Sequence, residues 1–92
     1  MNKTIHKYGV PIVDDCAVVL PKGAVVLSVH TQRGQPFMWA EVDPDAPLVE
    51  RRFCLRGTGH PFQGSEGGFV GTFLLHDGGL VFHLYEHNSP EA

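Results

Sequence analysis

"FVGTFLLHDGGLVFHLYEH", residues 69–87, decides the fold, because it reads as two strands joined by a tight turn. Asp77-Gly78 readily takes the positive φ angles of a type I′ turn. This turn predicts a fully apolar face, made of the pairs Leu75 and Leu80, Phe73 and Phe82, and Gly71 and Leu84. Moving the loop to Gly78-Gly79 keeps the same residues on that face. The other face is mixed and aromatic, with Val70, Thr72, Leu74, His76, Val81, His83, Tyr85 and His87.

A second hairpin precedes it. With Arg33-Gly34 as a two-residue turn, position i pairs with position 67 minus i. One face is then entirely apolar, pairing Val25 with Val42, Leu27 with Ala40 and Val29 with Met38. The opposite face carries Phe37 and Trp39.

Eleven glycines and seven prolines interrupt the chain as a whole, and no long stretch shows helical periodicity. The sequence therefore predicts an all-β fold, a small antiparallel sandwich or barrel of six to seven strands built from meander hairpins, with residues 1–92 as one domain. The expected strands are 3–9, 16–20, 24–32, 36–43, 48–56, 69–76 and 80–87. Residues 62–68, "FQGSEGG", are expected to be mobile, and residues 88–92 to form a flexible tail.

Composition limits the function classes. A chain of 92 residues can just sustain one core, so a homo-oligomer is expected. The formal net charge of −3 gives no general attraction for nucleic acid or anionic membranes. Neither a signal peptide nor a membrane span is apparent, which favours a cytoplasmic location.

The cysteines and histidines give no metal or disulfide signal. Cys16 and Cys54 lack CxxC spacing and are expected to be buried thiols. His83 and His87 are four apart on a strand, too far for one ion, so no metal and no cofactor are predicted.

The stretch "RGTGHPF", residues 56–62, is the candidate ligand site. Its glycines let backbone amides converge on a phosphate or carboxylate, and arginine, threonine and histidine side chains add donors. The predicted ligand-binding residues are Arg52, Arg56, Gly57, Thr58, Gly59, His60 and Trp39, the last as a stacking surface. The alternative is a tight corner with solvated arginines on an edge strand.

Aromatic side chains opposite the apolar faces suggest a second kind of site. The predicted partner interface contains Phe37, Trp39, Val81, His83 and Tyr85. The alternative is that a second sheet covers these residues as core. No GxSxG or HExxH motif occurs, so no catalytic residue is assigned.

The segments "IHKYGVPI", "VLSV", "MWAEVD", "ERRF", "GTGHP", "VGTF" and "LVFHLYE" resemble, in order, a family of small uncharacterised bacteriophage and prophage proteins. The matching positions include Lys7, Tyr8, Trp39, Asp43, Arg52, Gly57, Gly59, His60, Pro61, Gly71 and His83. The family is a domain of unknown function, so no residue roles come with it. Its context implies counter-defence inside a host cell, by analogy of class.

Two functional hypotheses follow from the residues and this context. The first is a non-enzymatic protein that captures an anionic small molecule, such as a cyclic nucleotide signal. The second is a protein–protein inhibitor of a host defence complex, similar to an anti-CRISPR, acting through an aromatic patch. A small nucleotide hydrolase ranks third.

Overall fold

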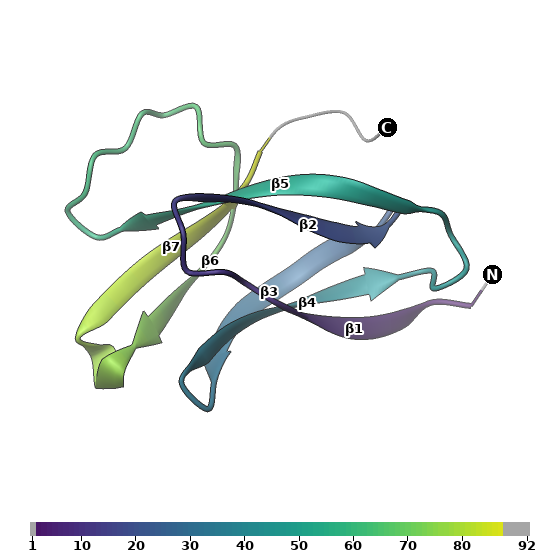
Figure 1. Cartoon of the computed structure of the whole chain (residues 1–92), viewed down its shortest axis with the longest axis horizontal. Helices are drawn as coiled ribbons and strands as arrows, with labels where there is room; N and C mark the ends of the chain where they lie inside the picture. The colour runs from purple at the N-terminus through teal and green to yellow at the C-terminus, as the bar shows by residue number, and fades with distance from the viewer. Residues whose placement is uncertain (1, 88–92) are drawn as a thin grey trace.

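The computed structural model describes residues 2–87, and they form an all-β sandwich of two antiparallel sheets (Figure 1). The predicted tail at 88–92 lies outside the described residues. One sheet has the strand order β1-β4-β3 and the other has the order β2-β5-β7-β6. The elements are β1 (Thr4–Gly9), β2 (Asp15–Pro21), β3 (Val25–Gln32), β4 (Gln35–Val42), β5 (Leu48–Gly57), β6 (Gly68–Leu75), the short 3₁₀ helix η1 (His76–Gly78) and β7 (Leu80–Glu86).

The core lies between the sheets and is built from alternate positions of their strands, as period-2 patterning requires. Leu20 of β2, Met38 and Ala40 of β4 and Leu84 of β7 are completely buried. The other buried apolar residues are Val10, Ala24, Val29, Val42, Phe53, Cys54, Leu55, Phe73 and Leu75. The central strands β4, β5 and β7 therefore supply half of the core cluster, and Cys54 is buried outside that cluster.

The β6–β7 hairpin has the predicted register. Leu75 pairs with Leu80, Phe73 with Phe82 and Gly71 with Leu84. The connection differs in detail, because residues 76–79 link the strands and the first three of them have positive φ. Positive φ angles at Asp77 and Gly78 agree with the prediction, whereas the left-handed conformation of His76 was not predicted.

The register predicted for the β3–β4 hairpin is confirmed near the turn but is wrong farther from it. Arg33 and Gly34 both have positive φ, and Val29 faces Met38 as predicted. A β-bulge between Val26 and Ser28 then shifts the pairing by one residue. As a result Val25 and Leu27, predicted for the core, are about half exposed, at 50% and 48%.

The two sheets meet where β3 lies beside β6. An added Cβ atom at Gly71 would approach Cγ1 of Val29 to 2.9 Å, so the glycine permits this close packing. Farther along, the Thr31 hydroxyl donates a hydrogen bond to the Leu74 carbonyl. These contacts also show that β3 and β6 run in the same direction.

Candidate functional site

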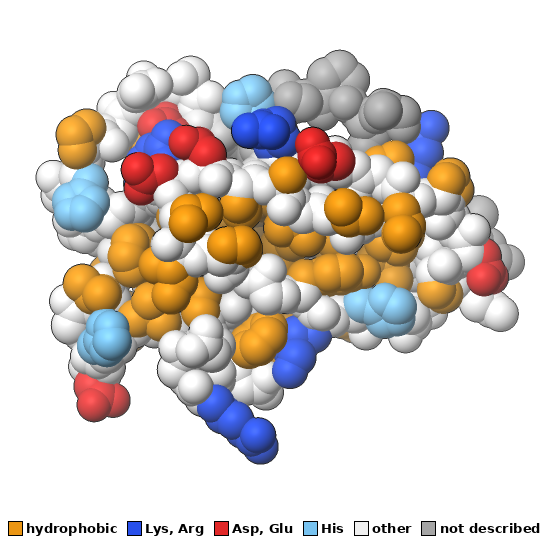
Figure 2. All heavy atoms as spheres, in the orientation of Figure 1, with side chains coloured by type: hydrophobic (Ala, Val, Ile, Leu, Met, Phe, Trp, Pro, Cys, Tyr) orange, Lys and Arg blue, Asp and Glu red, His pale blue; other side chains and the backbone are white. Residues whose placement is uncertain are grey.

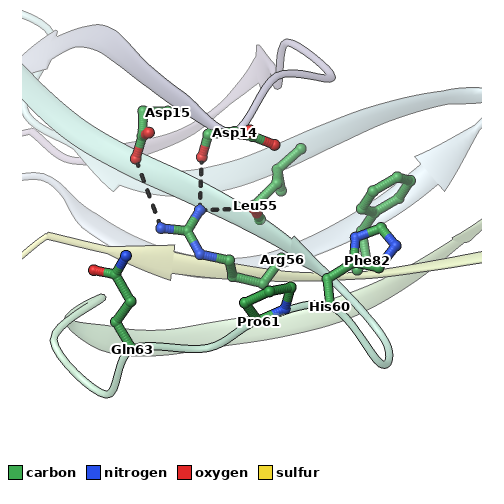
Figure 3. Close-up of a pocket in the computed structure, with 9 residues that line it drawn as sticks. Asp14, Asp15, Leu55, Arg56, His60, Pro61, Gln63 and Phe82 are labelled. Atoms are coloured by element: carbon green, nitrogen blue, oxygen red, sulfur yellow. Dashed lines mark hydrogen bonds and ion pairs between the residues drawn. The ribbon is translucent and has the colours of Figure 1, made fainter.

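A cleft of about 420 Å³ surrounds Arg56 at the end of β5. It lies between the connection from β1 to β2 and the loop that follows β5 (Figure 3). In the close-up, the guanidinium points toward Asp14 and Asp15, whereas His60 and Phe82 lie at the other end of the cleft. The full lining is Asp14, Asp15, Leu55, Arg56, Gly57, His60, Pro61, Gln63 and Phe82.

The guanidinium of Arg56 is already occupied by this chain. Its Nε donates to the Glu66 carboxylate at 3.2 Å. Its Nη1 donates to the carbonyls of Asp14 at 3.1 Å and Leu55 at 2.9 Å, and its Nη2 lies 3.9 Å from an oxygen of Asp15. Arg56 therefore links the β1–β2 connection, the end of β5 and the loop that contains Glu66. Its guanidinium N–H groups donate to oxygens of the protein itself.

Glu66 is the buried partner of that arginine, with a side chain only 1% exposed. Its carboxylate also accepts the backbone N–H groups of Gln63 at 2.8 Å and Gly64 at 2.7 Å. Burial by itself raises the pKa of Glu66, but the Gln63 amide, the Arg56 side chain and the nearby backbone amides outweigh burial and lower that pKa. The segment predicted to be mobile is thus anchored at its centre by an ionised glutamate.

The glycines of "RGTGHPF" form a corner. The amide of Thr58 donates to the Val81 carbonyl at 3.1 Å, and the amide of His60 donates to the Gly57 carbonyl at 3.0 Å. Gly59 has a φ of +84°, a conformation that favours glycine. An added Cβ atom at Gly57 would lie 2.7 Å from Nδ1 of His60, so this glycine makes room for the ring. The geometry agrees with the corner interpretation, because two of the amides expected to bind an anion are bonded within the protein.

The structure does not bring the other predicted ligand residues together. Trp39 lies on β4 in the other sheet, between buried Met38 and Ala40, and therefore faces outward from the three-stranded layer. Arg52 is exposed on β5. Because Arg56 and Trp39 belong to outer surfaces of different sheets, Trp39 cannot stack on a ligand held by Arg56.

The predicted interface residues also divide between the two outer faces. Trp39 packs near His30 and Phe37, with ring centroids 5.9 and 6.4 Å away. The Lys7 ammonium lies 4.4 Å from the centre of the Phe37 ring, within cation–π range. Half-buried Val81, His83 and Tyr85 belong to β7 in the four-stranded sheet.

Tyr85 lies at the centre of an aromatic patch, which we define as Phe62, Phe69 and Tyr85. The ring centroids of Phe62 and Phe69 lie 5.2 and 5.4 Å from that of Tyr85. Phe62 is 54% exposed and Phe69 is 60% exposed. Sequence reasoning found Tyr85 but missed both phenylalanines, because Phe62 lies in a loop and a β-bulge turns Phe69 outward.

His83 is held by two threonines. Thr58 Oγ1 lies 2.7 Å from its Nε2, and Thr72 Oγ1 lies 2.8 Å from its Nδ1. The hydroxyl–imidazole pair resembles part of a hydrolase triad, but a hydroxyl stands where such triads have a carboxylate. The register pair Thr72 and His83 could have indicated this contact from the sequence.

Both cysteines are free thiols; Cys54 is buried as predicted, whereas Cys16 is only half-buried. Burial raises the pKa of each thiol, and Cys54 donates weakly to the Glu66 carbonyl at 3.7 Å. Within residues 2–87, no three His, Cys, Asp or Glu side chains are grouped to hold a metal ion. The same residues contain no helix with the length and apolar character needed to cross a bilayer.

The fold and surface define a small all-β sandwich with aromatic side chains on both outer faces and an internally occupied arginine cleft. The chain belongs to the family described as Domain of unknown function (DUF7352), whose model matches residues 1–92. A search of curated proteins found no match, and neither did a search of solved structures.

Proposed function

We propose that this chain is a non-enzymatic binding protein that docks on a partner protein through the aromatic patch. The observation that carries the proposal is the pair of phenylalanines, each more than half exposed, that flank Tyr85. Exposed aromatic clusters are unusual on proteins that bind nothing, and aromatic residues dominate the binding energy of interfaces.

Other apolar side chains on the surface of the molecule also support a protein partner. Large apolar side chains are exposed outside the core, and Figure 2 shows hydrophobic side chains in a broad band across the face in view, with charged groups along its upper rim. An apolar centre with a polar rim is the usual anatomy of a protein interface.

The charges of the cleft disfavour the other hypothesis, capture of an anionic nucleotide. Arg56 is paired with Glu66, and the carboxylates of Asp14 and Asp15 leave the cleft with more negative than positive groups. An added phosphate would have to displace a buried ion pair and approach two carboxylates.

The resemblance to phage proteins supplies the class of partner. We propose that the target is a host defence complex in the bacterial cytoplasm, and that the chain acts as an inhibitor or adaptor by covering part of that complex. Membership of a family of unknown function assigns no target, so this proposal depends on the context that the resemblance implies.

The test is capture of host proteins from a bacterial lysate by the immobilised wild-type chain and two variants. We expect Phe62→Ala to weaken capture of a specific partner by about tenfold or more, the effect of removing an aromatic anchor. Trp39→Ala, on the other sheet, is the matched control and should keep the partner. Loss with Trp39→Ala and retention with Phe62→Ala would overturn the assignment to this patch.

The same preparation tests the nucleotide hypothesis. Thermal melting is measured with and without cyclic dinucleotides for the wild type and for Arg52→Ala. A rise in melting temperature that disappears in Arg52→Ala would favour the small-ligand function over the protein-docking function.

A further inference from the structure

A groove of about 570 Å³ separates the first residues of β3 from those of β6. Its two walls come from residues 24–27 and 68–70, and its floor comes from β5 and the end of β7. We call this space the edge groove.

Two bulges mark its closed end. Val29 and Thr31 of β3 contact β6. On the N-terminal side of these contacts, the pairing of β3 with β4 shifts at Leu27. The pairing of β6 with β7 shifts between Phe69 and Gly71. Bulges bend strands and increase their twist, so opposed bulges explain why β3 and β6 separate at this level.

Both walls are edge strands. β3 is the last strand of the three-stranded sheet, and β6 is the last strand of the four-stranded sheet. Edge strands present backbone N–H and C=O groups to any chain that lies alongside. Such edges are usually protected by lysine or proline, but here the walls carry the half-exposed apolar side chains of Val25, Leu27 and Phe69.

The floor is electrically balanced. Arg51 Nη2 donates to Glu86 at 2.8 Å, and Arg51 Nη1 donates to the Ala24 carbonyl. The Arg51 guanidinium and the Glu86 carboxylate neutralise each other, so these two groups in the described part of the groove do not select a charged ligand. Its chemistry favours a neutral backbone with apolar side chains.

We propose that the edge groove accepts an extended apolar segment of the partner protein, which adds as a strand to β3 and β6 together. Because β3 and β6 run in the same direction, one inserted segment is antiparallel to both and joins the two sheets. Four extended residues span about 13 Å, which suits walls of three to four residues. Phe69 belongs to both the groove and the aromatic patch, so a bound segment can continue onto the patch.

The inference rests on the proposed docking function, and its test uses peptides. A library of linear peptides is selected against the whole chain, and selected peptides are measured by titration calorimetry. We expect apolar residues at alternate positions, as strand addition requires. Leu27→Lys should weaken binding about tenfold or more, and so should N-methylation of alternate peptide bonds.

The controls distinguish loss of the groove from loss of the fold and from failure of the proposed docking function. Ile5→Lys adds the same charge at a somewhat more exposed position of β1 and should leave peptide affinity unchanged. Val25→Lys replaces Leu27→Lys if circular dichroism shows that the latter is unfolded. The inference is overturned if no peptide is enriched, or if the groove variants leave peptide affinity unchanged. A partner protein that is lost with Phe62→Ala but kept with Leu27→Lys leaves the docking function standing and removes the groove.

Discussion

Glu66 fixes the loop between β5 and β6, because Arg56 and the amides of Gln63 and Gly64 converge on one buried carboxylate. Glu66→Gln keeps the size of the side chain but turns an amide N–H toward these donors and leaves Arg56 without its buried counter-charge. We expect the melting temperature to fall by about 5 °C or more. Thermal unfolding by circular dichroism measures this, and Glu50→Gln, at an exposed position of β5, should change it little.

The same carboxylate makes stability depend on pH. The pKa of Glu66 is lowered in the folded protein from its ordinary value of 4.5, so the folded state favours the ionised form. Its stabilising contribution is complete above pH 4.5 and is lost as pH falls through the folded pKa. We expect the urea midpoint to drop less between pH 7 and pH 3 in Glu66→Gln than in the wild type. Equal drops would contradict the assignment.

At the scale of elements, Gly67 shows why β6 begins where it does. Its φ is +113°, and an added Cβ atom would lie 2.0 Å from the carbonyl oxygen of Glu86. Gly67→Ala should therefore destabilise the fold by about 3 kcal/mol or more, because the obstacle is backbone. Gly64→Ala is the matched control, since Gly64 has a φ of +86° with open space around it. This variant should lose only about 1–2 kcal/mol of stability, which is what a left-handed alanine costs. Urea denaturation compares the two variants.

The bulge in β3 gives a second prediction for an element. Deleting Leu27 leaves Ser28 opposite Trp39 and Val26 opposite Ala40, so we expect the sandwich to be retained. Deleting Thr31 instead moves the preceding residues of β3 to the opposite face and should unfold the chain. The dispersion of amide signals in two-dimensional NMR spectra distinguishes these results.

Turn chemistry explains what could be predicted from the sequence. Arg33-Gly34 and the segment around Asp77-Gly78 set the registers nearby, and both registers are confirmed. The bulge at Leu27 could not be predicted, because Val25, Val26 and Leu27 are all apolar and either register satisfies the pattern. The sequence did not predict that Glu66 anchors the loop, because a glutamate among glycines is typical of a solvated loop. Its partner Arg56 is also ten residues away in the chain.

At the scale of the whole molecule, one thin core between two small sheets carries the stability, so losses in it should be felt throughout the chain. Leu84 is fully buried on β7 at the middle of its sheet. Leu84→Ala should cost about 2–5 kcal/mol, a large part of the 5–15 kcal/mol that such domains possess. Leu48→Ala, at a side chain 67% exposed, should cost less than about 0.5 kcal/mol. If urea denaturation showed equal losses for the two variants, the sandwich core would not be the source of stability, and a partner chain covering Leu48 would have to supply it.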